Sequence, residues 1–256
     1  MRVHDGFCDR EADPVAAGRG IPRSVGAVET VKKVRELSRI DLRCRVETAR
    51  TDMLELLKKF PDDQRSGFHA VQYICSRIKS PESMMEKLKR KALPETLESA
   101  LCEVHDAVGV RVICSFADDV FRVEKWLKSQ ENYELVKEKD YISYPKPNGY
   151  RGIHLILRGM TGKTAGTYVE IQLRTIAMDF WASLEHKMRY KKNIAPEQVK
   201  FLQEELSDCA IQSAALDERM QNIRNVIIQN SEDDGETTPE ETGFPLMMAL
   251  RDGRRR

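Results

Sequence analysis

The sequence predicts a mixed fold of the α/β or α+β class, with strands and helices interleaved in its middle and helices at both ends. Between residues 69 and 190, segments rich in β-branched and aromatic residues alternate with segments of helical periodicity. Longer runs of helical periodicity flank this region on both sides. The 256 residues, of which 41% are hydrophobic, are enough to bury a core.

The N-terminal third begins with an arm and continues into a helix and a strand. Residues 1–28 are rich in Gly, Pro, Ala and charge without periodicity, so we expect a flexible arm there. From Thr30, apolar residues recur every three to four positions, which predicts one long helix, or two joined near Asp41, ending at Pro61. Residues 69–79 are β-branched and aromatic, which favours a strand.

The middle of the chain alternates between the two kinds of element. Ser80 suits an N-cap and Pro81 a first helical turn, so a helix should begin here and stop before Pro94. The Pro and Asn-Gly signals within residues 144–150 predict a loop. The remaining segments are predicted as a buried strand (107–116), a helix from Asp118, a short strand (133–139) and two strands joined by a Gly/Thr turn (152–159 and 167–174).

Two helices, 176–190 and 196–229, should close the folded part. The second carries an apolar seam that suits packing against another helix, in this chain or in a partner subunit. The seam comprises Val199, Leu202, Leu206, Cys209, Leu216, Met220, Ile223 and Ile227. Residues 230–256 are expected to be a disordered tail, because residues 230–241 hold six acids and no base. The predicted organisation is therefore an arm (1–28), a central domain (29–195), a C-terminal helix (196–229) and a tail (230–256).

Composition excludes several classes of protein. The net charge of +1 gives no general attraction to nucleic acid or anionic lipid. The N-terminal residues do not form a signal peptide, and no apolar run approaches the ~20 residues that span a bilayer. The six cysteines form no CxxC pair or zinc-like spacing, which favours reduced thiols and a cytoplasmic location.

The first candidate site is the basic segment 77–91, which holds six cations and two carboxylates. Arg77 and Lys79 are two apart at a strand end and face the same way. Lys87 and Arg90 are three apart and share a helix face. Together these cations could hold several phosphates. The alternative is a solvated basic helix face.

The second candidate is Asp106, at the mouth of an apolar strand that contains Arg111. An arginine among Ala, Val and Ile is costly unless it emerges at the sheet's end or is paired. A structural Asp106–Arg111 pair is therefore the alternative to a catalytic role.

Two further candidates follow along the chain. In residues 169–174 apolar and polar residues alternate strictly, so Glu170, Gln172 and Arg174 share one strand face, which is either solvated or the floor of a cleft. Residues 146–154 offer a tyrosine ring for stacking, cations and a histidine. The alternative there is an ordinary turn with one exposed tyrosine.

Together these groups supply cations for a polyphosphate, an aromatic platform and two separate carboxylates, Asp106 and Glu170. Two carboxylates at strand ends suit Mg²⁺, which prefers few carboxylates together with substrate phosphates. The combination predicts phosphoryl or nucleotidyl transfer, in which positioning and charge neutralisation dominate. The sequence contains neither a Walker loop nor a kinase glycine loop, which excludes those two chemistries.

Four motifs in this order resemble the synthetase domain of the RelA/SpoT homologues. They are RIKSPESMMEKLKRK (77–91), HDAVGVRVICSFADDV (105–120), KDYISYPKPNGYRGIH (139–154) and VEIQLRTIAMDFWASLEHKMRYK (169–191). The resemblance runs from about Thr30 to Asn230 and is nearest to the small, RelQ-like alarmone synthetases, which have no hydrolase domain. It implies an α+β, nucleotidyltransferase-like mixed sheet flanked by helices. It also implies pyrophosphate transfer from ATP to the ribose 3′-hydroxyl of GDP or GTP, giving (p)ppGpp and AMP.

The resemblance also implies roles for individual residues on the donor side. Arg77 and Arg111 would stack on adenine. Asp106 and Glu170 would bind Mg²⁺, and Glu170 would also be the base for the acceptor hydroxyl. The implied ATP-binding residues are Arg77, Lys79, Lys87, Arg90 and Arg111.

On the acceptor side, the resemblance implies that Tyr150 stacks on guanine. Glu185 is a weaker addition to the site. Gly152 stands where the family pattern usually has Ser, which removes a hydroxyl from the acceptor side. The implied residues for GDP or GTP are Lys146, Asn148, Tyr150, Arg151, His154 and Gln172.

Two other functions remain as alternatives. One is a pyrophosphokinase of the same fold that acts on the tRNA 3′ end or on adenine nucleotides, and the other is a non-catalytic nucleotide- or RNA-binding module. Asp106 and Glu170 favour catalysis, because a pure binder needs no metal-binding base. We also expect a homo-oligomer through the helix 196–229, a tetramer by resemblance, with docking on its own domain as the alternative. An alarmone or RNA regulator is expected by analogy.

Overall fold

The computed structural model describes residues 25–61, 67–189 and 196–233 of the chain. The expectations of a flexible arm and a disordered tail concern residues that lie mostly outside these ranges. The chain divides into two compact units, Met1–Asp41 and Leu42–Arg256. The strands that the structure describes all belong to the second unit.

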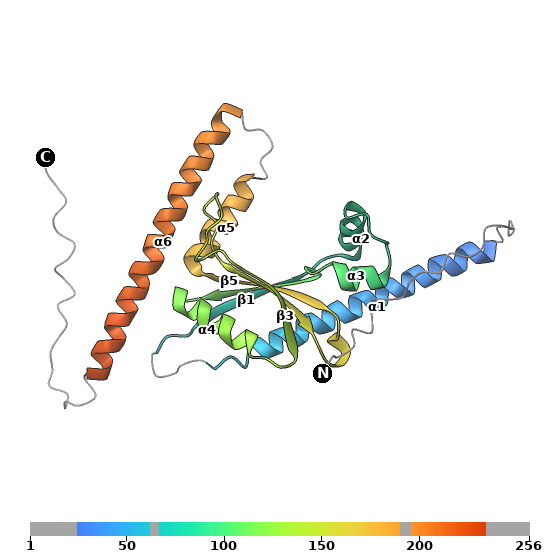
Figure 1. Ribbon diagram of the computed structural model, residues 1–256, viewed down its shortest axis with the longest axis horizontal. Helices are drawn as coiled ribbons and strands as arrows, with labels where there is room; N and C mark the ends of the chain where they lie inside the picture. The colour runs from blue at the N-terminus through green and yellow to red at the C-terminus, as the bar shows by residue number, and fades with distance from the viewer. Residues whose placement is uncertain (1–24, 62–66, 190–195, 234–256) are drawn as a thin grey trace, which may run out of the picture. The chain divides into compact units, whose positions relative to one another are not determined.

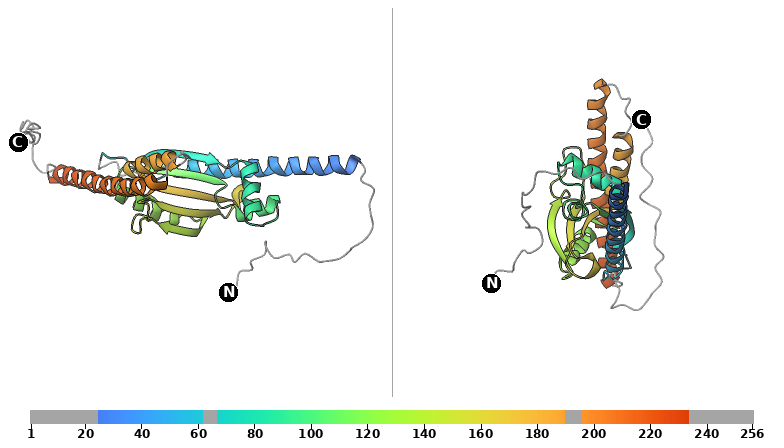
Figure 2. Two further views of the ribbon diagram at one scale, coloured as in Figure 1. Left: turned by 90° about the horizontal axis from the view of Figure 1, so that it is seen from above. Right: turned by 90° about the vertical axis from the view of Figure 1, so that its right-hand side faces the viewer.

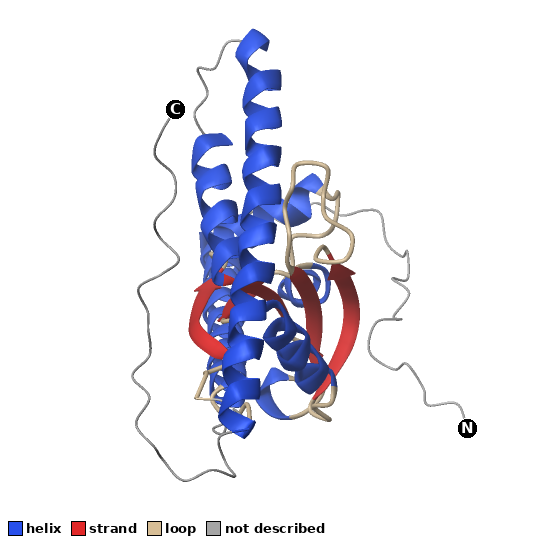
Figure 3. Ribbon diagram, turned by 90° about the vertical axis from the view of Figure 1, so that its left-hand side faces the viewer, coloured by secondary structure: helices blue, strands red, loops and turns tan. Residues whose placement is uncertain are grey.

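Five strands form one mixed sheet in the order β1-β2-β5-β4-β3. Strands β2 and β5 run parallel, and the other neighbouring pairs are antiparallel. Figure 3 shows the strands as a curved layer with helices packed against it. The predicted α+β class, with a mixed sheet flanked by helices, is confirmed. The strands are β1 (Val71–Ile78), β2 (Val108–Cys114), β3 (Tyr133–Asp140), β4 (Ile153–Gly159) and β5 (Tyr168–Thr175).

The helices largely follow the predicted pattern, with differences at their ends. Helix α1 begins at Val25, before the predicted start at Thr30, and passes through Asp41 as one helix. Among the described helices, none is long and apolar enough to cross a bilayer. The helices are α1 (Val25–Leu57), α2 (Pro81–Arg90), α3 (Leu97–Glu103), α4 (Ala117–Lys128), α5 (Ile176–Arg189) and α6 (Pro196–Asp233), with a short 3₁₀ turn η2 (Gly162–Thr164).

Capping side chains fix the short helices near the site. The backbone N–H of Ser83 donates to Ser80 Oγ at 3.2 Å, which confirms the predicted N-cap of α2. Helix α3 was not predicted, because its seven residues are too few to show periodicity. The Thr96 hydroxyl caps it by accepting from the backbone N–H of Ser99 at 3.1 Å.

One face of the sheet is covered by the core. Val110, Ile171 and Leu155, from three adjacent strands, are buried under helices α1 and α4. The Leu42–Leu57 part of α1 lies on the same side of the sheet as α4, as Figure 1 shows. Because strand residues alternate between faces, the opposite face receives the polar residues of β2, β4 and β5. That polar face carries the candidate site.

Candidate active site

Strand register places the candidate side chains in two rows across the polar face. In the first row, Arg77 of β1 pairs with Gly109 of β2, and Gly109 pairs with Glu170 of β5. In the second row, Arg111 of β2 pairs with Gln172 of β5. Gln172 in turn pairs with His154 of β4, and His154 with Lys139 of β3. The predicted alternation of residues 169–174 is therefore confirmed.

Gly109 makes room for Arg77 within the first row. A Cβ at Gly109 would lie 3.2 Å from both Cγ and Nε of Arg77, which is closer than side chains normally approach. The absence of a side chain at this position lets Arg77 extend over β2 toward Glu170. The positive charge of Arg77 also helps to lower the pKa of Glu170.

Asp106 joins the end of β1 to helix α2. Lys79 donates to its Oδ2 and Lys87 to its Oδ1, both at 2.6 Å. Burial alone would raise the pKa of Asp106, but the hydrogen bonds from these two lysines hold it below its ordinary value. The alternative of a structural Asp106–Arg111 pair is wrong, because Arg111 forms its ion pair with Asp179, at 3.1 Å.

Glu170 lies in the same cleft and is bordered by a histidine. Its Oε1 is 3.6 Å from Nδ1 of His154. The interaction with His154 lowers the pKa of Glu170, while burial and the nearby charge of Asp106 oppose that shift. The side chain is therefore a carboxylate at neutral pH and can accept a proton.

A cleft with about 550 Å³ of open space connects these groups. It brings together four predicted residues, and it adds Lys137, Lys139 and His105, which sequence reasoning missed. Lys137 and Lys139 are two apart on β3 and so point to the same face, but only the pairing of β3 with β4 brings them here. The lining residues are Lys87, His105, Asp106, Lys137, Lys139, His154, Ile156 and Glu170.

Tyr150 is buried, at 9% exposure, so the alternative of a turn with one exposed tyrosine is wrong for this residue. Its hydroxyl oxygen is 2.5 Å from Nε2 of His154. The guanidinium of Arg174 lies 5.1 Å from the centre of its ring, and Nζ of Lys146 lies 4.7 Å from it. Stacking of a purine on this ring would therefore require Lys146 to move.

The loop between β3 and β4 that carries Tyr150 is also held by α5 and α6. Asn148 accepts from the backbone N–H of Tyr150 and donates to Oε1 of Glu185, both at 3.3 Å. Gly149 has a φ of +86°, and a Cβ there would lie 2.5 Å from Cβ of Ala210 in α6. A side chain at Gly149 would thus push the loop away from α6.

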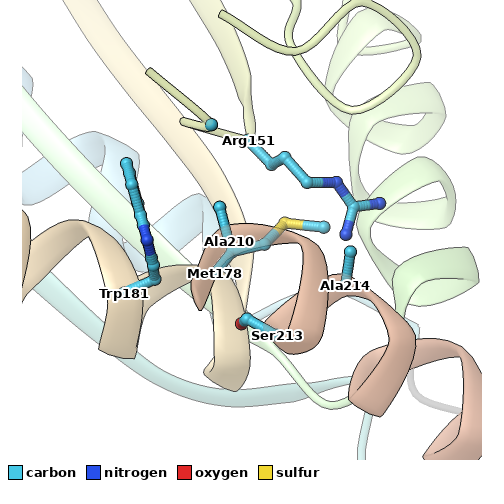
Figure 4. A pocket seen from close by; sticks show the side chains of 7 residues that line it. Arg151, Met178, Trp181, Ala210, Ser213 and Ala214 are labelled. Carbon is cyan, nitrogen blue, oxygen red and sulfur yellow. The ribbon is translucent and has the colours of Figure 1, made fainter. Parts of the chain in front are cut away.

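The other nine predicted residues are not among those that line the cleft, and two of them, Arg90 and Arg151, lie in different surroundings. Arg90 is exposed on α2. Arg151 lines a small pocket with Met178, Trp181 and Ser213, between the loop and helices α5 and α6 (Figure 4). Nη1 of Arg151 is buried and has no hydrogen-bond partner in the part of the chain that the structure describes.

The donors available for a divalent metal ion fit a magnesium site that is completed by substrate. Among the described residues, no three His, Cys, Asp or Glu side chains come together as a metal site. Asp106 and Glu170 line one cleft, and the charge of Asp106 acts to raise the pKa of Glu170. Two carboxylates beside lysines match a hard cation whose other ligands are phosphate oxygens and water.

Comparison with solved structures identifies the class of fold. The chain is similar to the crystal structure of small alarmone synthetase 2 from Bacillus subtilis, with a TM-score of 0.58 and 41% identity over 70% of this chain and 94% of that one. It is also similar to small alarmone synthetase 1 from Bacillus subtilis bound to its product pppGpp. That match has a TM-score of 0.59 and 30% identity, over 76% of this chain and 98% of that one.

Sequence comparison identifies the family. A family model described as "Region found in RelA / SpoT proteins" matches residues 76–195 of this chain. GTP pyrophosphokinase YwaC of Bacillus subtilis is 45% identical over 165 residues, which cover 63% of this chain and 77% of that protein. The chain therefore belongs to the RelA/SpoT family, as its four motifs predict.

Proposed function

We propose that the chain is a GTP pyrophosphokinase that transfers the β,γ-pyrophosphate of ATP to the ribose 3′-hydroxyl of GDP or GTP. The products are AMP and (p)ppGpp. The observation that carries this proposal is the cleft in which two carboxylates, Asp106 and Glu170, lie among lysines from α2 and β3. Its relatives are GTP pyrophosphokinases by name, and one structural neighbour holds pppGpp.

The proposed reaction is an in-line displacement at the β-phosphorus of ATP. The 3′-oxygen attacks this phosphorus, Glu170 accepts the hydroxyl proton, and the bond to the α,β-bridging oxygen breaks as AMP leaves. Lys79 and Lys87 now contact Asp106, and in this proposal they release it and bind phosphate oxygens of ATP instead. Lys137 and Lys139 add positive charge on the opposite wall of the cleft, beside His154.

We further propose that Asp106 and Glu170 hold Mg²⁺ together with the substrate phosphates. The ion would neutralise charge on the transferred group. The proposal is supported by the two lysine contacts of Asp106, in which this carboxylate already accepts two cationic partners at 2.6 Å.

Product analysis tests the function and its alternatives together. Labelled ATP is incubated with the purified chain and Mg²⁺, and GDP, GTP, an adenine nucleotide or tRNA is supplied separately. We expect AMP release that requires GDP or GTP. Release with tRNA or an adenine nucleotide alone would move the chain to another acceptor. The absence of AMP with every acceptor would favour a non-catalytic binding module.

The pH dependence of turnover should report on the contact between His154 and Glu170. A base must be unprotonated, so the rate should fall only as pH drops through the lowered pKa of Glu170. His154→Gln removes the largest cause of that lowering, and burial then acts to raise the pKa. The acid limb of kcat/KM should therefore move to higher pH.

The matched control is His105→Gln, since His105 lines the same cleft but has no contact with Glu170 among those described. Its acid limb should keep the wild-type position. An unmoved limb in His154→Gln would contradict the assignment of Glu170 as the base.

Helix α6 has one face that packs on the domain and another that does not. The packed face is mainly small or polar, and it includes Ala210, Asp217 and Arg224, which are all at most 9% exposed. Asp217 accepts from Oγ1 of Thr175, and Arg224 pairs with Asp118 at the start of α4. Helices α5 and α6 lie side by side, as Figure 2 shows.

Most of the apolar seam predicted from the sequence lies on a different face of α6, but Leu206 is half-buried and packs beside Tyr150 and Trp181. Leu216, Met220 and Ile223 are 54%, 50% and 55% exposed. Docking on the domain therefore occurs, but it leaves these seam residues uncovered by the described chain. Exposed apolar rows of this kind are typical of helix–helix interfaces. We propose that the seam joins copies of the chain into a homo-oligomer, a tetramer by resemblance.

Charge in the seam should break this assembly. The variant with Met220→Glu and Ile223→Glu is expected to have a lower mass by light scattering than the wild type, because carboxylates would be buried at the interface. The control with Asn222→Glu and Gln229→Glu adds the same charge on another exposed face of α6 and should leave the mass unchanged. A wild-type mass near the 29.4 kDa of one chain, at micromolar concentration, would contradict the oligomer.

A further inference from the structure

A buried ion pair connects β5 with α5 at the edge of the polar face. Nη1 of Arg174, near the end of β5, donates to Oδ1 of Asp179, in the first turn of α5, at 2.9 Å. The two residues are 6% and 9% exposed. A buried pair gains little stability over apolar residues of similar volume, because both charges must be desolvated. The other contacts of Arg174 and Asp179 therefore indicate which role besides stability this pair has.

Arg174 reaches the acceptor side of the site. Its Nη2 donates to the hydroxyl oxygen of Tyr150 at 3.0 Å and to Oε1 of Gln172 at 2.9 Å. Tyr150 meets His154 through the same hydroxyl, and His154 borders Glu170. A short chain of polar contacts thus runs from Arg174 to the proposed base.

Asp179 reaches the donor side. Its Oδ1 is also 3.1 Å from Nη1 of Arg111, and its Oδ2 accepts from the hydroxyl of Tyr73 at 3.4 Å. Two guanidinium groups therefore share one carboxylate oxygen. The side chain of Arg111 is 37% exposed and that of Arg174 only 7%. Arg111 can thus turn toward a ligand while Arg174 stays fixed by its other partners.

We propose that Arg174 and Asp179 are positioning residues that hold Arg111 and Tyr150 in one charged network. Arg111 serves the ATP side and Tyr150 the guanosine side, so affinity for both nucleotides depends on the same carboxylate. This inference rests on the proposed function, because it takes the ATP side and the guanosine side from the roles that the family resemblance implies for Arg111 and Tyr150. Neither residue needs to touch a nucleotide.

The two substitutions make different predictions. Asp179→Asn removes the charge that holds both arginines, so it should weaken binding of GDP and of a non-hydrolysable ATP analogue. Each should weaken roughly tenfold, the usual loss for one charge-assisted hydrogen bond. Arg174→Gln leaves Asp179 free to hold Arg111, so it should weaken GDP binding alone. Arg174→Lys should restore part of that loss.

Asp217→Asn is the matched control for burial and charge. Asp217 is also 9% exposed, and it accepts from Oγ1 of Thr175, the neighbour of Arg174, at 2.6 Å. The control should lose thermal stability to a similar extent without a change in either affinity. Calorimetric titration measures the affinity for each nucleotide separately, and kcat and both KM values are measured on the same variants. Together these values distinguish a positioning role from a general loss of fold.

Several results would overturn the proposal. These are unchanged affinities in Asp179→Asn, equal weakening of both nucleotides in Arg174→Gln, or the same losses in Asp217→Asn. Should Asp179→Asn fail to fold by circular dichroism, the selective loss in Arg174→Gln and its recovery in Arg174→Lys decide. If the wild-type protein binds both nucleotides but forms no AMP, the proposed function is rejected. The titrations of the variants still test whether Arg174 and Asp179 form the proposed network.

Discussion

Replacing Glu170 with Gln should lower turnover by roughly 10²–10⁴-fold, the usual contribution of a general base. Glutamine preserves the shape and hydrogen-bonding reach of the side chain but cannot take the proton of a hydroxyl group. In the wild type, His154 keeps the pKa of this carboxyl low, so it is ready to accept a proton at neutral pH. Arg77 and His154 keep their strand positions in the variant, and binding of both nucleotides should stay measurable.

The experiment compares AMP release with binding in the same preparations. Glu134→Gln is the control, because Glu134 lies exposed on β3 and pairs at 3.8 Å with Arg158, outside the residues that line the cleft. The control should keep wild-type turnover. Unchanged turnover in Glu170→Gln would reject Glu170 as the base. Loss of binding together with turnover would assign the residue to substrate binding instead.

Much of the site on β1, β5 and α2 was predictable from local sequence. Strand alternation places Glu170 and Gln172 on one face and Ile171 on the other, whatever the strand pairs with. Lys79 follows β1 directly, and Ser80 caps α2, so the position of Lys87 in the last turn of that helix follows from where the cap starts it.

The second wall of the cleft was not predictable in the same way. Lys137 and Lys139 look like ordinary residues of an exposed edge strand, because six of the eight residues of β3 are exposed. Only their pairing with Ile156 and His154 brings them beside Glu170. Pairing depends on the tertiary arrangement of strands, and β3 also contains a register shift between Leu135 and Lys137, which no local pattern specifies.

Partners of the arginines were also beyond sequence reasoning. Arg111 and Asp106 are near in sequence, which suggested a pair, yet the carboxylate that meets Arg111 comes from Asp179, on a helix far along the chain. The grouping of Arg151 with the acceptor residues came from the family resemblance, in whose motif it stands beside Tyr150. Neighbours in an extended segment point to opposite sides, and Arg151 instead lines the pocket with Trp181.

Replacing Asp106 with Asn should lower turnover on the order of 100-fold or more, because it removes one of only two proposed metal-binding carboxylates. The same change should act differently on ATP binding. In the wild type, the Asp106 carboxylate contacts the ammonium groups of Lys79 and Lys87 at 2.6 Å, and the variant removes that negative charge. Without Mg²⁺, the freed lysines should bind the phosphates of ATP at least as tightly as in the wild type.

The opposite signs of these effects make the test decisive. ATP affinity is measured in EDTA, and turnover is titrated with Mg²⁺, for the wild type, Asp106→Asn and the nearby control Glu103→Gln, which is half-buried at the end of α3. We expect Asp106→Asn to retain ATP binding in EDTA while its turnover needs far more Mg²⁺. If Asp106 only orders the two lysines, ATP affinity should fall and the Mg²⁺ requirement should match the wild type. That outcome would remove Asp106 from the proposed metal site and leave Glu170 as its one carboxylate.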